Sequence, residues 1–232
     1  MERYCRWWQE GYLSSTGECF DIGNATSEAL ARFQETGEPM AGSDNPRKAG
    51  IGSIKRLAPI PMFFFSSWAI ADPLPDFEVM LEELGQWAIS SSRTTHGAAE
   101  CLEACEWYAR AIVRALYDQS KEEILLADGD MDLGCELIRD IAQGKYRTKT
   151  RDEISGSGYV VKSLEAALWC FDQTDSFREA ILMAANLGDD ADTTAAVCGQ
   201  IAGAFYGESG IPKDWLGKLA HVDLIRQLSD RL

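Results

Sequence analysis

Apolar side chains recur at helical spacing along almost the whole chain, and no stretch alternates apolar and polar residues long enough to predict a β-strand. At 232 residues, 46% of them hydrophobic, the chain is long enough to bury one large core. The sequence therefore predicts an all-α fold, with one compact multi-helix domain over residues 1–232. Helices are expected over residues 4–12, 26–36, 77–90, 98–117, 160–171, 176–186 and 192–206, with one or two more over 121–142 and short ones over 212–216 and 219–232.

Two of these segments carry more specific expectations. Pro59 and Pro61 are expected to break the first turn of the apolar stretch 54–71, so that a buried helix begins at Met62. The core face of the helix over residues 77–90 is expected to consist of Val79, Leu81, Leu84 and Trp87.

The charge balance limits the classes of partner. The chain has 37 acidic and 22 basic residues, a net charge of −15, which excludes a general nucleic-acid binder and a binder of anionic membranes. Its two histidines exclude a His-rich zinc or copper site.

The cysteines and the apolar stretches indicate the compartment. The seven cysteines contain no CxxC pair and indicate reduced, buried thiols. The longest charge-free apolar stretch, residues 57–71, is too short to span a bilayer, and the N-terminus has no signal-peptide core. The sequence therefore predicts a cytoplasmic protein that does not enter a membrane.

The most informative segment is the acidic cluster Gly188–Thr194, in which three aspartates directly precede an apolar helix. Carboxylates this close repel one another, so a positive charge must offset them. Two interpretations are open at this point. Asp192 is the N-cap of the helix, with Asp189 and Asp190 interacting with the helix dipole. Alternatively, the Asp-x-Asp-Thr oxygens bind a hard cation such as Mg²⁺.

The residues around this cluster resemble the signature of the ADP-ribosylglycohydrolases, a family that includes the dinitrogenase reductase-activating glycohydrolase. The resemblance is carried by several motifs that appear in the family's order across nearly the whole chain. They are NLGDDADTTAA (186–196), GQIAGA and YG (199–207), GSGYVV and LEAALW (156–169), SRTTH (92–96) and GIGSIKRLAP (50–59).

The resemblance implies an activity and a metal site. Members of the family are all-helical and hydrolyse the bond that joins ADP-ribose to an acceptor, often an arginine side chain, with two Mg²⁺ or Mn²⁺ ions. By position in the motif, Asp190, Asp192 and Thr193 match metal ligands. The expected partners are ADP-ribose or an ADP-ribosylated protein.

The resemblance also implies a substrate site. Tyr159 matches an aromatic residue that stacks on adenine, and His96 matches a histidine near the ribose or diphosphate. The remaining matches are loop residues that face the nucleotide or approach the diphosphate: Ser157, Gly158, Gly50, Gly52 and Ser53. No catalytic residue is singled out, and the residues do not identify the acceptor.

The sequence departs from the family pattern in three places. The family's N-terminal Gly-Asp and Asp-Asp-Thr motifs are absent, so the domain is expected to be truncated, to lack its N-terminal helices and to hold at most a partial metal site. Ile51 stands in the diphosphate loop where the family has Asn. Lys55 and Lys162 are unusual basic residues, expected either to pair with phosphate or the acidic cluster or to be solvated.

These departures leave three functions open. The first is a metal-dependent ADP-ribosyl hydrolase, impaired by the absent motif. The second is a non-catalytic ADP-ribose-binding relative or a decayed remnant, and the third is an acidic helical interaction protein that matches by accident. Self-association through apolar surface exposed by the truncation is also expected.

Overall fold

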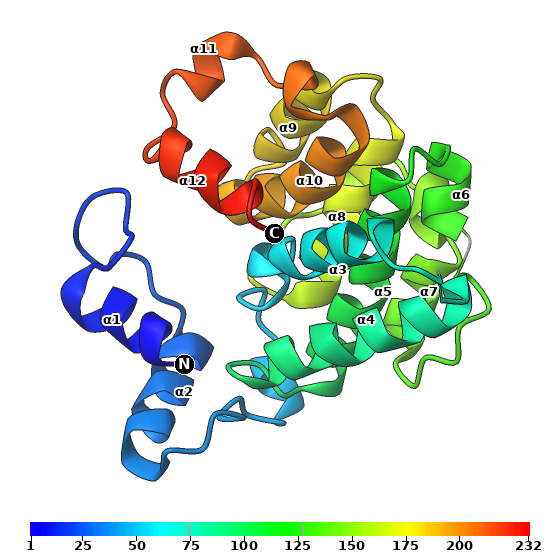
Figure 1. The fold of residues 1–232 in the computed structure, drawn as a ribbon. Helices are drawn as coiled ribbons and strands as arrows, with labels where there is room; N and C mark the ends of the chain where they lie inside the picture. The colour runs from blue at the N-terminus through cyan, green and yellow to red at the C-terminus, as the bar shows by residue number, and fades with distance from the viewer. Residues whose placement is uncertain (74, 127) are drawn as a thin grey trace.

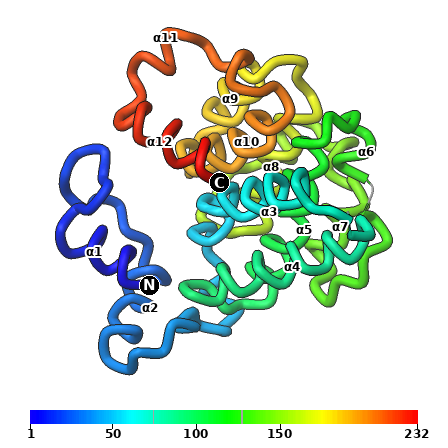
Figure 2. The backbone as a smooth tube through the Cα atoms, in the orientation of Figure 1, coloured from blue at the N-terminus to red at the C-terminus, as the bar shows by residue number. Residues whose placement is uncertain are grey.

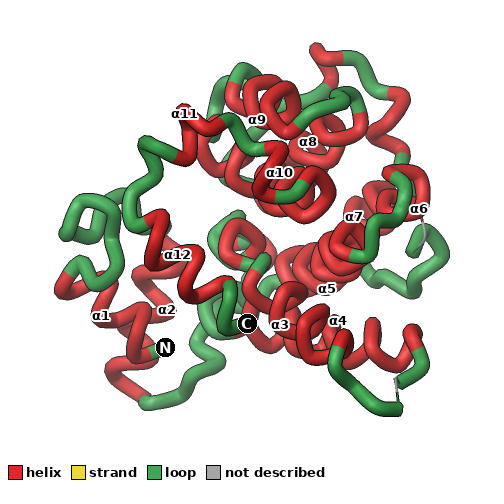
Figure 3. Tube along the Cα trace, turned by 45° about the horizontal axis from the view of Figure 1, so that its top comes forward, coloured by secondary structure: helices red, strands yellow, loops and turns green. Residues whose placement is uncertain are grey.

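The structure is a computed structural model that describes residues 1–73, 75–126 and 128–232. These residues form twelve α-helices and no sheet, which confirms the all-α prediction; Figure 3 shows helices joined by loops throughout. The helices are α1 (Glu2–Glu10), α2 (Asn24–Thr36), α3 (Pro59–Ala69), α4 (Phe77–Arg93), α5 (Ala99–Leu116), α6 (Lys121–Leu126), α7 (Glu136–Ala142), α8 (Val160–Asp172), α9 (Phe177–Ala185), α10 (Ala191–Tyr206), α11 (Lys213–Leu216) and α12 (Val222–Ser229). Residue 127, within the stretch expected to be helical over 121–142, lies outside the described residues.

Helix α5 lies at the centre of the molecule and is buried along most of its length (Figure 1). It packs against α3, α4, α8 and α10, and α10 packs in turn against α8 and α9. The largest aromatic side chains that are fully enclosed are Trp107, Tyr108, Tyr146 and Phe171, and three of them lie on α5 and α8, at the centre of the core.

The first two helices stand apart from this body. α1 and α2 contact each other and connect to the rest through the long loop over residues 37–53 (Figure 2). On the same side of the molecule, the Nε2–H of His221, at the start of α12, donates to the carbonyl of Ser14 at 3.1 Å.

Two details of the prediction were wrong. Helix α3 begins at Pro59, not at Met62, because its prolines lie in the first turn, where backbone N–H groups have no helical partner to lose. In α4 the side chains of Val79 and Trp87 are 59% and 58% exposed, and the buried face is formed by Met80, Leu81, Leu84 and Ala88.

A side chain from α10 forms hydrogen bonds with the backbone of the turn that precedes α3. Gln200 accepts a hydrogen bond from the Ala58 N–H at 2.7 Å and donates to the Ile54 carbonyl at 2.9 Å. The 3-10 turn η2 (Ile54–Arg56) is thereby bonded to α10, although the two are far apart in the sequence.

Among the described helices, none is both long and apolar enough to cross a membrane.

Candidate active site

The loop before η2 and the loop before α8 run side by side. Gly50 forms an isolated antiparallel bridge with Tyr159, and the Val160 N–H donates to the Ala49 carbonyl at 3.0 Å. This pairing brings two of the expected substrate loops into contact.

A cavity of about 690 Å³ opens beside this pairing, and we call it the loop cavity. Seven of the ten residues predicted for the site line it: Gly50, Gly52, His96, Gly158, Tyr159, Asp190 and Thr193. Segments from four parts of the sequence therefore converge on one space.

The other three predicted residues lie elsewhere. Ser53 is only 2% exposed, and its hydroxyl accepts a weak hydrogen bond from the Cys105 thiol, at 3.5 Å. The Ser157 hydroxyl accepts from the N–H of Tyr159 at 3.2 Å. Asp192 lines a second, adjoining cavity. The Ser157 side chain thus holds the local backbone, the Ser53 side chain points into the core, and neither lines the loop cavity.

The start of α10 differs from the arrangement that the N-cap interpretation predicts. Asp190, not Asp192, is the N-cap residue, and its side chain makes no capping hydrogen bond. Gly188 and Asp189 adopt left-handed conformations, with φ of 83° and 52°, and they turn the chain so that the helix begins one residue after Asp190. The Asp190 carboxylate is therefore not occupied by helix capping.

The donors at this helix start are oxygens of the kind that Mg²⁺ and Mn²⁺ prefer. They are two carboxylates, from Asp190 and Asp192, and the hydroxyl of the buried Thr193. In the part of the chain that the structure describes, no three His, Cys, Asp or Glu side chains form a metal-binding group. The donor set fits a hard divalent cation in kind, but supplies only part of a ligand shell.

The adjoining cavity, of about 600 Å³, is lined by the aromatic residues Tyr4, Trp7, Tyr12 and Phe20, and we call it the aromatic cavity. It shares five residues with the loop cavity: Asp21, Gly23, Thr26, Gly52 and Lys55. Asp190 and Thr193 line the loop cavity, whereas Asp192 lines the aromatic cavity. The acidic cluster therefore stands where the two cavities meet.

Asp21 is a candidate functional residue that sequence reasoning missed. It lines both cavities and has a left-handed backbone, with φ of 49°. Residues other than glycine rarely adopt this conformation, and at functional sites it can mark a constrained side chain. The sequence signal that could have indicated Asp21 is its position just before Gly23 and the start of α2. Many ordinary turns have the same pattern, so this signal is not specific.

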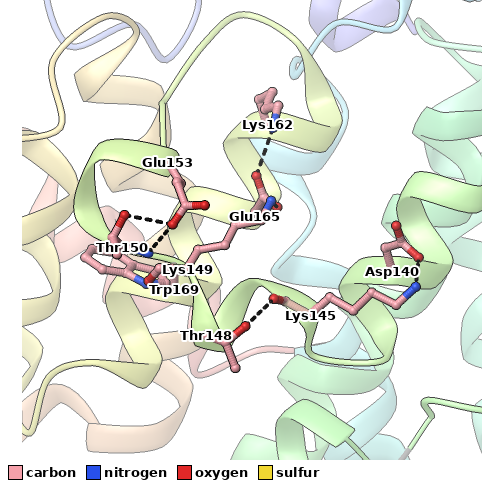
Figure 4. Close-up of polar contacts among 9 residues, drawn as sticks. All are labelled: Asp140, Lys145, Thr148, Lys149, Thr150, Glu153, Lys162, Glu165 and Trp169. Carbon is pink, nitrogen blue, oxygen red and sulfur yellow. Dashed lines mark hydrogen bonds and ion pairs between the residues drawn. The ribbon is translucent and has the colours of Figure 1, made fainter.

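The two unusual lysines have different surroundings. Lys162 forms an ion pair with Glu165 at 3.1 Å, and Lys149 also pairs with Glu165, so this group is a network of its own (Figure 4). Lys55 is exposed and lines both cavities. Of the two, only Lys55 is placed to meet a ligand.

Tyr159 presents a partly buried ring to the loop cavity. Its hydroxyl donates to Glu100 at 2.7 Å, and burial together with this carboxylate raises the pKa of the phenol. The hydroxyl is therefore fixed and protonated, which leaves the ring as the part of Tyr159 that can contact a ligand.

His96 packs tightly against the loop that carries Gly50 and Gly52, which we call the glycine loop. A Cβ atom placed on Gly52 lies 2.5 Å from His96 Cε1, whereas one on Gly50 lies 3.4 Å from Nε2, an ordinary contact. Gly52 is thus required by the imidazole ring itself, in addition to any ligand that the loop approaches.

Burial lowers the pKa of His96 to about 4, and the nearby charges of Arg56 and Lys55 act in the same direction. Between this pKa and the ordinary value near 6.5, the unfolded chain binds more protons than the folded one, so stability falls as the pH falls. We expect His96 to contribute a loss of about 2 kcal/mol between pH 7 and pH 5.

Urea unfolding at both pH values measures this loss. The matched variant His96→Gln has no titrating ring, and its stability is expected to change less over the same interval by about that amount. Equal changes in the two proteins would contradict the prediction.

The family model for ADP-ribosylglycohydrolase matches residues 1–232. The chain is 41% identical over 231 residues to the ADP-ribosylarginine hydrolase Tri1 of Serratia proteamaculans (strain 568), covering 100% of this chain and 59% of the relative. It is 40% identical over 232 residues to the protein of the same name from Pseudomonas putida (strain GB-1), covering 98% of this chain and 57% of the relative.

The names of a third relative and of a solved structure indicate the same family. The chain is 25% identical over 199 residues to the ADP-ribosyl-[dinitrogen reductase] glycohydrolase of Rhodospirillum rubrum, covering 86% of this chain and 60% of that protein. A solved structure described as an ADP-ribosylglycohydrolase-related protein complex matches with a TM-score of 0.75 and 35% identity, over 89% of this chain and 67% of that chain. The chain spans less than two thirds of the length of these sequence relatives. It belongs to the ADP-ribosylglycohydrolase family.

Proposed function

We propose that the protein is a hydrolase that removes ADP-ribose from a modified protein side chain, with arginine as the acceptor. The observation that carries this proposal is the convergence of the glycine loop, Tyr159, His96 and the acidic start of α10 on one cavity. The name of the two relatives at 40% identity or more supports arginine as the acceptor.

The loop cavity has a balanced charge, whereas the whole chain has a net charge of −15. Three basic residues line it, Arg47, Lys48 and Lys55, beside the acidic residues Asp21, Glu28 and Asp190, and Lys48 pairs with Glu28. In this proposal the diphosphate lies near these cations and the glycine loop, and adenine stacks on the ring of Tyr159.

The proposed cofactor is Mg²⁺ or Mn²⁺, held on this chain by Asp190, Asp192 and Thr193. When bound, such ions orient the ribose hydroxyls, activate water and offset developing charge. The residues of the chain itself bind and orient: the carboxylates fix the ribose end at the junction of the cavities, while the loops fix the nucleotide end.

A second candidate function is ADP-ribose binding without catalysis. The observation that favours it is the partial ligand shell, since no third acidic, histidine or cysteine side chain joins Asp190 and Asp192 among the described residues. Both functions require the loop cavity to bind ADP-ribose, and they differ in whether hydrolysis follows.

Calorimetric titration with ADP-ribose, with and without Mg²⁺, tests the proposal. We expect binding that Mg²⁺ strengthens, and at least about tenfold weaker binding in Tyr159→Ala, because a base stacked on an aromatic ring gains about 1–3 kcal/mol. Asp192→Ala is expected to remove the Mg²⁺ dependence.

Two exposed residues away from both cavities provide matched controls, Trp87→Ala for the aromatic change and Asp214→Ala for the acidic change. Both are expected to bind ADP-ribose as the unaltered protein does. No binding of ADP-ribose under any condition would contradict both candidate functions, whereas binding without turnover of an ADP-ribosylated protein would favour the second.

Two further expectations form part of the proposal. All seven cysteines are free thiols, which supports a reducing compartment such as the cytoplasm. Self-association stays a prediction, supported by the exposed apolar side chains Phe63, Ile70 and Trp87 on α3 and α4 and at their ends.

A further inference from the structure

His96 has one ring nitrogen with a partner and one without. The residue is 3% exposed, and its Nδ1 lies 2.8 Å from the hydroxyl oxygen of Thr95. Its Nε2 has no hydrogen-bond partner within the described residues, and the ring lines the loop cavity. Nε2 is not a fully buried atom, so it is open to the loop cavity, where water or a ligand can supply its partner.

The partner of Nδ1 is itself held by an arginine. Nη2 of Arg56 donates to the Thr95 hydroxyl oxygen at 2.9 Å. A guanidinium group has donors only, so the Thr95 oxygen must accept this bond. Thr95 is 2% exposed, and the only acceptor for its own hydroxyl proton among the described residues is Nδ1 of His96. Satisfying all three groups places the imidazole proton on Nε2.

Arg56 cannot easily turn away from this arrangement. The same Nη2 atom also approaches the Ser91 carbonyl and the Thr94 hydroxyl, both at 3.0 Å, at the end of α4. Its guanidinium carbon lies 4.9 Å from the centre of the Tyr4 ring on α1. Contacts from two helices thus hold the guanidinium group in place, and the two protons of Nη2 are shared among its three oxygen acceptors.

Burial, together with the charges around it, keeps the ring of His96 uncharged near neutral pH. Burial, Arg56 and Lys55 all lower its pKa, while Asp190 faces the same cavity from α10 and Glu100 bonds Tyr159 on the opposite loop. A neutral imidazole has one donor and one acceptor nitrogen, so the identity of the donor depends on the neighbours of the ring.

We propose that Arg56 and Thr95 are positioning residues that hold the ring proton of His96 on Nε2, so that this nitrogen donates a hydrogen bond to an oxygen of ADP-ribose bound in the loop cavity. The identity of the ligand rests on the proposed function. The position of the proton does not, because it follows from the contacts of Thr95 alone.

Nitrogen-15 NMR of histidine-labelled protein at pH 7.5 measures the tautomer directly. The chain has only two histidines, and His221→Gln assigns the two ring systems. We expect Nε2–H for His96 in the unaltered protein and in Thr95→Ser, which keeps the hydroxyl. In Thr95→Val, which has nearly the same shape but no hydroxyl, we expect a mixture or Nδ1–H.

Two NMR results would overturn the proposal. One is Nδ1–H in the unaltered protein, and the other is an unchanged tautomer in Thr95→Val. A proton–nitrogen correlation spectrum of each variant verifies that it is folded, and Thr95→Ser separates loss of the hydroxyl from general disturbance of the site.

Calorimetry with ADP-ribose tests the role of the donor. We expect about tenfold weaker binding in Thr95→Val and nearly unchanged binding in Thr95→Ser, because a hydrogen bond to a charged group is stronger than one between neutral groups. A changed tautomer with unchanged ADP-ribose affinity would overturn the ligand role. If the unaltered protein does not bind ADP-ribose, the proposed function fails, while the NMR result still decides where the proton lies.

Discussion

Asparagine in place of Asp192 is expected to slow the hydrolysis of ADP-ribosylarginine by at least about 100-fold, since even changes beyond the direct ligands of a metal cost about 10–100-fold. The substitution keeps the shape and removes the charge. Asp192 is exposed in the first turn of α10 and makes no described ion pair, so its charge contributes little to the fold. The measurement is release of ADP-ribose from an ADP-ribosylated protein in the presence of Mg²⁺.

The same acidic cluster supplies the control. Asp189 is exposed, precedes α10 and lines neither cavity, so Asp189→Asn is expected to leave the rate nearly unchanged; asparagine tolerates the left-handed backbone at this position. Equal rates in Asp192→Asn and the unaltered protein would show that this carboxylate has no part in the reaction. An undiminished rate with a metal chelator would remove the cation from the proposal.

A methyl group on Gly52 is expected to weaken ADP-ribose binding at least about tenfold, through loss of the His96 hydrogen bond, and to lower the free energy of unfolding by about 1–3 kcal/mol. The added Cβ lies 2.5 Å from Cε1 and 2.9 Å from Nε2 of the His96 ring, so either the ring or the loop must move. The ring is held by Thr95 on its other side, which leaves it little room to retreat.

Gly50→Ala is the matched control for this change. Its Cβ meets the same ring at 3.4 Å, and Gly50, like Gly52, does not require a left-handed backbone. We expect a loss of stability of less than about 1 kcal/mol. Urea unfolding and calorimetry with ADP-ribose measure both variants, and equal effects at the two positions would contradict the steric argument.

The helices were predictable because their apolar spacing repeats over many residues, but the choice of face was not. In α4 the side chains of Val79 and Trp87 fit a helical stripe as well as Met80 and Leu84 do. Only the position of α5 selects the second stripe, and a single helix contains no information about its neighbour. The start of α3 was missed for a local reason, because proline ends a helix in its interior but is favourable in its first turn.

The sequence predicted which segments meet at the site better than it predicted where individual side chains point. The motifs located the loops that meet at Gly50 and Tyr159, and the acidic start of α10. The direction of Ser53 into the core depends on a backbone geometry that the motif does not encode. The aromatic cavity was missed because it forms only when α1 and the following loop fold against η2.

The hydrogen bonds of Gln200 have a consequence for how the site opens. They join η2, which carries Lys55 and Arg56, to the helix whose first turn carries Asp192 and Thr193. The amide of Ala58 is covered by a side chain of α10, so its exchange with solvent deuterium must wait for that contact to break. The glycine loop and the acidic helix are therefore expected to belong to one cooperative unit, which opens and closes as a whole.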